Sequence, residues 1–292
     1  MSESFQASEI DAGLANITVK KTPHHTTRIR LYVPTTGQNG GVWSKKLPLV
    51  VYYHAGGFIT QGIDLKPVHD SCNLMARELN VVVASASYRV APEFRLPAAY
   101  EDGVDAVEWL SNSSEDDEWI KSYADLSNVL LVGTNSGGNV AYNVGVRLTF
   151  RNLTPLRIRG LILHEPFFGG EKRCESELRH VNGQAVRDFY WKLCLPEGAS
   201  RDHKYSNPTV GDGPDDMEKI GGMRWKVIVT GEGGRALIDR QRDVAKLLKE
   251  KGVDVVERFT DDGDGNNAEL GDHSRAQTLF ASIRSLIHSC AP

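Results

Sequence analysis

A series of apolar runs limits the folds open to this chain, because several of the runs are apolar on both faces of a strand. The runs span residues 47–54, 80–89, 128–133, 158–166, 224–231 and 253–259. Strands of this kind belong in a mostly parallel sheet covered by helices on both faces. Segments with helical spacing alternate with the runs, and a helix is predicted from about Ser274. The pattern predicts an α/β fold with a mostly parallel central sheet flanked by helices.

Two shorter features complete the predicted organisation. Residues 14–33 contain the alternating runs ANITVKK and TRIRLYV, which predict an antiparallel strand pair. Residues 171–223 are polar and rich in Gly and Pro, and predict a cap or insertion over one end of the sheet within a single domain of residues 1–292. Ligands of open parallel sheets bind at the carboxyl ends of the strands. The loops HAGGF, GTNSGG, TGEGGR and the one after VERF are therefore expected to converge on one site.

Composition excludes several classes of function. The 292 residues carry 38 acidic and 34 basic side chains, a formal net charge of −4, so no basic nucleic-acid surface is expected. No run of 18 apolar residues predicts a membrane span, and the polar start MSESFQASEIDAG lacks the features of a secretory signal. The four cysteines show no metal-binding spacing. We expect a cytoplasmic protein with a small-molecule ligand and no metal, nucleotide or flavin; a homodimer is compatible with this interpretation.

The segment GTNSGGN at 133–139 follows a buried strand and precedes helical spacing. Its glycines allow the sharp strand-to-helix turn of a nucleophile elbow, which aims one side chain outward. Asn135 occupies the middle position of that turn, and the backbone N–H of Ser136 is a candidate oxyanion donor. Taken alone, the segment is equally compatible with a phosphate-binding or merely tight turn.

The segment HAGGF at 54–58 is similar to a glycine-rich oxyanion loop. The N–H groups of Gly56 and Gly57 are predicted to face the carbonyl oxygen on which charge develops. His54 and Phe58 flank these glycines and are candidate pocket residues, although a histidine in such a loop is more often structural than a base. Taken alone, this segment also fits an ordinary glycine turn.

Long stretches of the sequence resemble the plant carboxylesterase family of the α/β-hydrolase fold. They include LPLVVYYHAGGFI, SYRVAPEFRLPAAYEDG, HEPFFGGEKR, SRDHKYSNPT and LIDRQRDVAKLLKEKGVDVV, and the resemblance extends from about residue 16 to about residue 285. It implies an α/β-hydrolase with a cap and an oxyanion loop. It also implies a serine in a GESAGGN or GDSAGGN segment, an aspartate in a G-x-x-G-D-P-L-I-D-R-Q-like segment and a histidine in a G-Y-H-A-V-like segment.

The chain departs from all three of these family segments. Asn135 stands at the place of the serine, Arg235 at that of the aspartate, and Asn267 at that of the histidine, with Asn266 as the alternative after a one-residue shift. An amide is not an ionisable nucleophile or base, and arginine is a permanent cation that would oppose an imidazolium. Ordinary ester hydrolysis is therefore not expected.

Two further residues are candidates for the pocket. His164 ends a buried strand and is either a pocket residue or, more commonly for such a position, a core histidine with its hydrogen bonds satisfied. Glu232 lies in the same loop as Arg235, with which it could form an ion pair. A retained oxyanion hole beside these groups suits the positioning and electrostatic stabilisation of a reacting molecule.

Three hypotheses follow from these departures. The first is a repurposed non-hydrolytic enzyme, a lyase or cyclase of plant specialised metabolism, that catalyses a cyclisation, elimination or isomerisation. The second is a small-molecule binding protein of the gibberellin-receptor type. The third is a degenerate or weakly active carboxylic-ester hydrolase.

Overall fold

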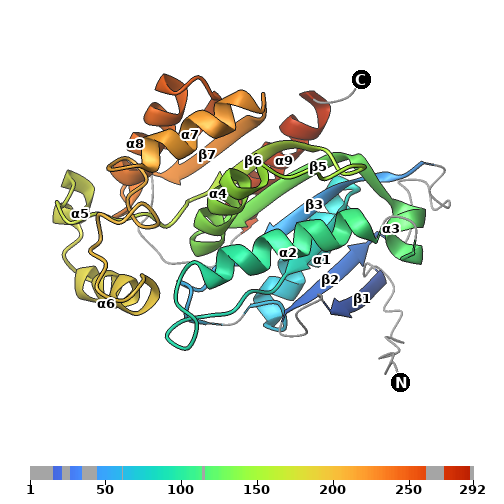
Figure 1. The fold of residues 1–292 in the computed structure, drawn as a ribbon, viewed down its shortest axis with the longest axis horizontal. Coiled ribbons are helices and arrows are strands. Elements are labelled where there is room, and N and C mark those ends of the chain that lie inside the picture. Colours follow the sequence, from blue (N-terminus) through green and yellow to red (C-terminus); the bar gives the residue numbers. More distant parts are fainter. Residues whose placement is uncertain are drawn as a thin grey trace.

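An eight-stranded sheet runs through the molecule in the computed structural model (Figure 1). The structure describes residues 16–21, 27–34, 45–60, 62–113, 116–260 and 273–289. The strands are β1 (Asn16–Lys21), β2 (Arg28–Val33), β3 (Leu47–Tyr53), β4 (Val82–Ala86), β5 (Ala124–Thr134), β6 (Ile158–His164), β7 (Lys226–Glu232) and β8 (Asp254–Thr260). The helices are α1 (Lys66–Leu79), α2 (Ala98–Asn112), α3 (Glu118–Tyr123), α4 (Ser136–Leu148), α5 (Glu175–Arg179), α6 (Gln184–Cys194), α7 (Gly213–Gly222), α8 (Ile238–Glu250) and α9 (His273–Ser289).

The strand order is β1-β2-β4-β3-β5-β6-β7-β8. The adjacent strands from β4 through β3, β5, β6 and β7 to β8 are parallel, whereas β1 pairs with β2, and β2 with β4, in antiparallel fashion. The prediction of a mostly parallel sheet with an antiparallel pair at the start of the chain is confirmed. The carboxyl ends of β3, β5, β6 and β7 therefore lie at one edge, which brings the loops that follow these strands together.

Helices cover both faces of the sheet, as runs apolar on both sides require. Helices α1 and α9 share one core with alternate residues of the strands, such as Tyr52 and Val132. Helices α2, α4 and α8 share the other core with the intervening residues, such as Val51 and Leu131, and Figure 1 shows α2 and α4 in front of the sheet. In the described part of the chain, no helix is long and apolar enough to cross a membrane.

The segment 171–223 contains α5, α6 and α7. Helices α5 and α6 lie at the end of the molecule away from α3, whereas α7 packs beside α4 and α8 (Figure 1). An ion pair of 2.8 Å between the almost fully buried Glu177 and Arg240 ties α5 to α8. The backbone N–H of Ser176 adds a hydrogen bond of 2.7 Å to the carboxylate of Asp239. These contacts anchor the segment to the helix that follows β7.

The close approach of β5 to α4 generates a prediction for Gly133. A Cβ atom at this position would overlap the backbone carbonyl of Gly137, and backbone on both sides leaves little room for adjustment. We expect Gly133→Ala to lower the free energy of unfolding by about 3 kcal/mol, measured by urea denaturation, because overpacking here must move α4 away from the sheet.

Gly222 provides the matched control for this substitution. Its Cβ would meet nothing within 4 Å, and alanine is favoured over glycine in a helix, so Gly222→Ala should be neutral or stabilising by up to about 1 kcal/mol. Equal losses from the two substitutions would contradict the packing argument.

Candidate functional site

A strained turn joins β5 to α4, and Asn135 is the residue at its apex. Its φ and ψ of 53° and −117° are rare for a residue with a side chain. Three backbone hydrogen bonds of 2.9 Å hold the turn: the N–H of Asn135 donates to the carbonyl of His164, and its own carbonyl accepts from the N–H groups of Gly138 and Phe167. The turn is thus clamped by β6 and the loop after it, and has the geometry of a nucleophile elbow.

The side chain of Asn135 is exposed to solvent more than those of its neighbours. Asn135 is half-buried between the buried Thr134 and the fully buried Ser136. Within the described part of the chain, its carboxamide makes no hydrogen bond, and it does not cap α4. The turn therefore presents a neutral donor and acceptor at the carboxyl edge of the sheet.

The loop after β3 contacts the start of α4 directly. The N–H of Gly57 donates a hydrogen bond of 2.9 Å to the hydroxyl oxygen of Ser136. Gly56 and Gly57 both have positive φ, and a Cβ on Gly57 would overlap the ring of Tyr190 from α6. The structure thus brings the three predicted oxyanion-hole residues together, with the Ser136 hydroxyl turned toward the loop.

His54 is a buried, uncharged histidine beneath this loop. Its Nδ1 lies 2.6 Å from the carbonyl oxygen of Ala55, and its ring stacks on that of Tyr88 with 4.3 Å between the centroids. Burial lowers the pKa of His54 to about 4, and the hydrogen bond with Ala55 opposes this shift. The contacts give His54 a structural role in supporting the loop.

Phe58 also lies in the interior. It is 1% exposed and packs at centroid distances of 5.7–6.4 Å against the rings of Tyr100, Phe167 and Trp191. Its φ of 62° adds a second strained residue to the loop after β3. Phe58 thus belongs to the aromatic core beneath the site.

His164 ends β6, and Arg235 lies in the loop that follows the neighbouring strand β7. The Nδ1 of His164 lies 2.7 Å from the hydroxyl of Thr230, and burial lowers the pKa of this histidine against the opposing charges of Glu165 and Glu232. The Nε of Arg235 donates to a carboxylate oxygen of Glu232 at 2.6 Å, so the pairing expected from the sequence is present. Asn266 and Asn267 lie outside the described residues.

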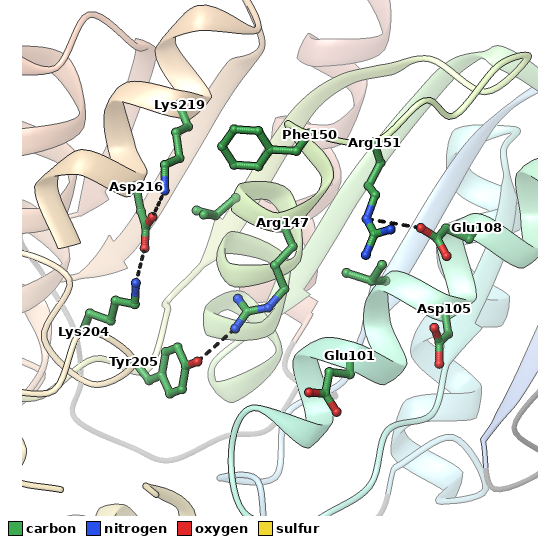
Figure 2. A pocket seen from close by; sticks show the side chains of 12 residues that line it. Glu101, Asp105, Glu108, Arg147, Phe150, Arg151, Lys204, Tyr205, Asp216 and Lys219 are labelled. Carbon is green, nitrogen blue, oxygen red and sulfur yellow. Dashed lines mark hydrogen bonds and ion pairs between the residues drawn. The ribbon is translucent and has the colours of Figure 1, made fainter. Parts of the chain in front are cut away.

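A groove of about 630 Å³ lies elsewhere, on the outer face of α2 and α4 (Figure 2). Figure 2 shows Glu101, Asp105 and Glu108 along α2, with Arg147 on α4 facing Tyr205. Arg151 crosses the groove to Glu108 at 3.6 Å. None of the residues predicted from the sequence is among those that line this groove.

Comparisons with known proteins agree with this geometry. Residues 50–263 match the family model described as alpha/beta hydrolase fold. An esterase structure from Pyrobaculum calidifontis superimposes with a TM-score of 0.73 at 22% identity, covering 94% of this chain and 84% of the other. The protein is therefore an α/β-hydrolase by fold.

Sequence relatives define the family more closely. Carboxylesterase 20 of Arabidopsis thaliana is 56% identical over 90% of this chain and 82% of its own. A 3-O-acetylpapaveroxine carboxylesterase of Papaver somniferum, CXE2, is 39% identical over 89% of this chain and 86% of its own. The chain belongs to the plant carboxylesterase family.

The strain at the turn predicts the effect of replacing Asn135 by glycine. An unfavourable backbone conformation costs about 1–3 kcal/mol, and glycine relieves it while losing about 0.5–1 kcal/mol to the greater entropy of the unfolded chain. We expect Asn135→Gly to raise the free energy of unfolding by about 1 kcal/mol in urea denaturation. Asn80→Gly is the control, because Asn80 occupies the left-handed helical region that asparagine tolerates. A loss of stability in Asn135→Gly would contradict the strain.

The buried neutral His54 predicts acid sensitivity. Its pKa of about 4 lies below the unfolded value of 6.5, so its contribution to stability is complete above pH 6.5 and is lost as pH falls toward 4. The loss amounts to about 3 kcal/mol at 1.36 kcal/mol per pKa unit. His54→Gln should flatten the fall in unfolding free energy between pH 6.5 and 4; the same slope in wild type and variant would count against this assignment.

Proposed function

We propose that this carboxylesterase-like protein acts on a small plant metabolite without serine-type ester hydrolysis, and catalyses a cyclisation, elimination or isomerisation at the turn between β5 and α4. The single observation behind the proposal is the position of Asn135. The elbow geometry is complete, with φ of 53° and a half-buried apical side chain, but that side chain is a carboxamide. An amide provides neither the nucleophile nor the proton transfer that hydrolysis by the serine mechanism needs.

The residues at the other two triad positions also support the proposal. Arg235 follows β7, where the family resemblance places the acid, and its guanidinium is held by Glu232. A cation there would raise the energy of an imidazolium rather than stabilise it. Together with Asn267, these residues make up the proposed substituted triad.

Such a site still has hydrogen-bond donors and acceptors that can contribute to catalysis. The N-terminus of α4 directs N–H groups and the positive end of the helix dipole toward the turn. The Asn135 carboxamide can donate to one group of a bound molecule and accept from another. Positioning and electrostatic stabilisation of this kind accelerate rearrangements that need no covalent intermediate. In this proposal α5 and α6 serve as the cap over the site, and the protein works in the cytoplasm.

A second candidate function is ester hydrolysis by another nucleophile. It is favoured by the names of the relatives, which describe Carboxylesterase 20 and the Papaver somniferum protein as carboxylesterases. Ser136 would be the first group to consider as that nucleophile. A third candidate is reversible binding of the small molecule without conversion, which the same pocket chemistry would support.

Hydrolysis of p-nitrophenyl butyrate by the purified protein tests the proposal. We expect wild-type turnover to stay within the roughly 10³–10⁴-fold advantage over water that an oxyanion hole and binding alone provide in serine-protease variants. Asn135→Ala should leave this rate unchanged, because the carboxamide performs no step of hydrolysis.

The remaining outcomes separate the candidates. Fast turnover that survives Asn135→Ala and disappears in Ser136→Ala would replace the proposal by hydrolysis through Ser136. Fast turnover abolished by Asn135→Ala would show that our account of Asn135 is wrong. With turnover at background, incubation with plant metabolite extracts followed by mass spectrometry distinguishes conversion from unchanged binding.

A further inference from the structure

The hydroxyl of Ser136 occupies a position that a ligand oxygen would otherwise take. The N–H of Gly57, one of the expected oxyanion donors, points at the Ser136 Oγ over 2.9 Å. Ser136 is fully buried, so this contact is shielded from water. Hydrogen bonds in such surroundings are stronger than exposed ones, and an incoming group has to compete with this one.

Tyr88 is a neighbour of the Ser136 hydroxyl. Burial raises the pKa of Tyr88, and the Ser136 hydroxyl opposes this shift. The Tyr88 hydroxyl in turn donates to the carbonyl of His54 at 2.8 Å. The Tyr88 hydroxyl proton is thus used by the backbone, while the Ser136 hydroxyl oxygen accepts from the Gly57 N–H. Ser136 therefore has one acceptor lone pair in use.

Helix α6 of the cap contacts Gly57 from the side opposite Ser136. The ring of Tyr190 on α6 lies so close to Gly57 that no Cβ would fit between them. The thiol of Cys194, at the end of α6, lies 3.5 Å from the carbonyl oxygen of Gly57. Gly57 is thus fixed between the hydroxyl of Ser136 on one side and α6 on the other.

This arrangement changes what the oxyanion hole can stabilise. In the described part of the chain, the N–H group of the partly buried Gly56 makes no hydrogen bond and remains for a ligand, which suits a neutral carbonyl oxygen. A ligand oxygen with a full negative charge lacks the third expected donor, the N–H of Gly57, which is already bonded to Ser136. Loss of one such donor costs other enzymes roughly 10²–10³ in rate.

We propose that the Ser136 hydroxyl is a built-in occupant of the oxyanion hole, so that the ligand of this site presents a neutral carbonyl group, such as that of a lactone, ketone or amide, rather than a carboxylate. The inference rests on the proposed function and narrows its ligand class. Ser136 acts here as a specificity-determining residue that works through the Gly57 N–H.

Butyrate and butyramide test the proposal as probes of equal length and different charge. Affinities of wild type and Ser136→Ala for each probe are measured by ligand-observed NMR titration. Hydrogen bonds to charged groups contribute enough for about a tenfold change in affinity. We expect Ser136→Ala to raise the butyrate affinity about tenfold relative to the butyramide affinity, because the Gly57 N–H becomes available to the anion. Ser136→Cys, with its weaker acceptor, should fall between the two and is the substitute if Ser136→Ala does not fold.

Ser282→Ala is the matched control. Ser282 is a fully buried serine of α9 whose hydroxyl donates to the carbonyl of Thr278, so its loss should leave the ratio of affinities unchanged. An unchanged ratio in Ser136→Ala, or no gain in butyrate binding, overturns the inference. Rapid hydrolysis of p-nitrophenyl butyrate by wild type would overturn the proposed function instead, so the two failures are distinguishable.

Discussion

The close crossing of three backbone segments at the start of α4 is the constraint on which the rest of the site depends. A side chain on Gly133 would overlap the carbonyl of Gly137, and one on Gly137 would overlap the carbonyl of Tyr53 at the end of β3. Where the segments approach this closely, Asn135 completes the turn in a strained conformation. The same crossing brings the loop after β3 within hydrogen-bond distance of Ser136. The position of the site and its internal contacts thus have one cause.

A buried polar network extends this constraint to the surrounding helices. The side-chain oxygen of Asn139, in the first turn of α4, accepts from the Tyr100 hydroxyl on α2 at 2.7 Å. Its amide group donates to the backbone carbonyls of Phe167 and Tyr205. A buried amide is tolerated because all these bonds are made, and losing one partner would leave the others unsatisfied. Through one side chain the elbow helix is therefore coupled to α2, to the loop after β6 and to the segment that follows α6.

Most of the fold, but only part of the site, could be predicted from the sequence. Runs such as LPLVVYYH and IRGLILH predict buried strands because they are nearly continuously apolar, and the structure has β3 and β6 there. The backbone turn at Asn135 was also predictable, since the glycines around it allow a sharp turn between strand and helix. Side-chain contacts between distant segments were not, because spacing carries no information about rotamers. The hydrogen bond between Gly57 and Ser136 joins residues 79 positions apart. The burial of Phe58 was missed for the same reason.

How the site works depends on the separate roles of Asn135 and Ser136. A serine directly after an elbow residue is equally compatible with a spare nucleophile and with a structural hydroxyl. The contact with Gly57 favours the second, because the hydroxyl oxygen already accepts a hydrogen bond and Ser136 has no exposed surface. In the proposed function the apex then depends on a carboxamide, which can bind a carbonyl compound through neutral hydrogen bonds. The backbone conformation of Asn135 costs about 1–3 kcal/mol, and the residue is half-buried while its neighbours are buried. In the proposed function such a turn orients a ligand group instead of attacking it, which is the physical reason to test for rearrangement or binding at the site.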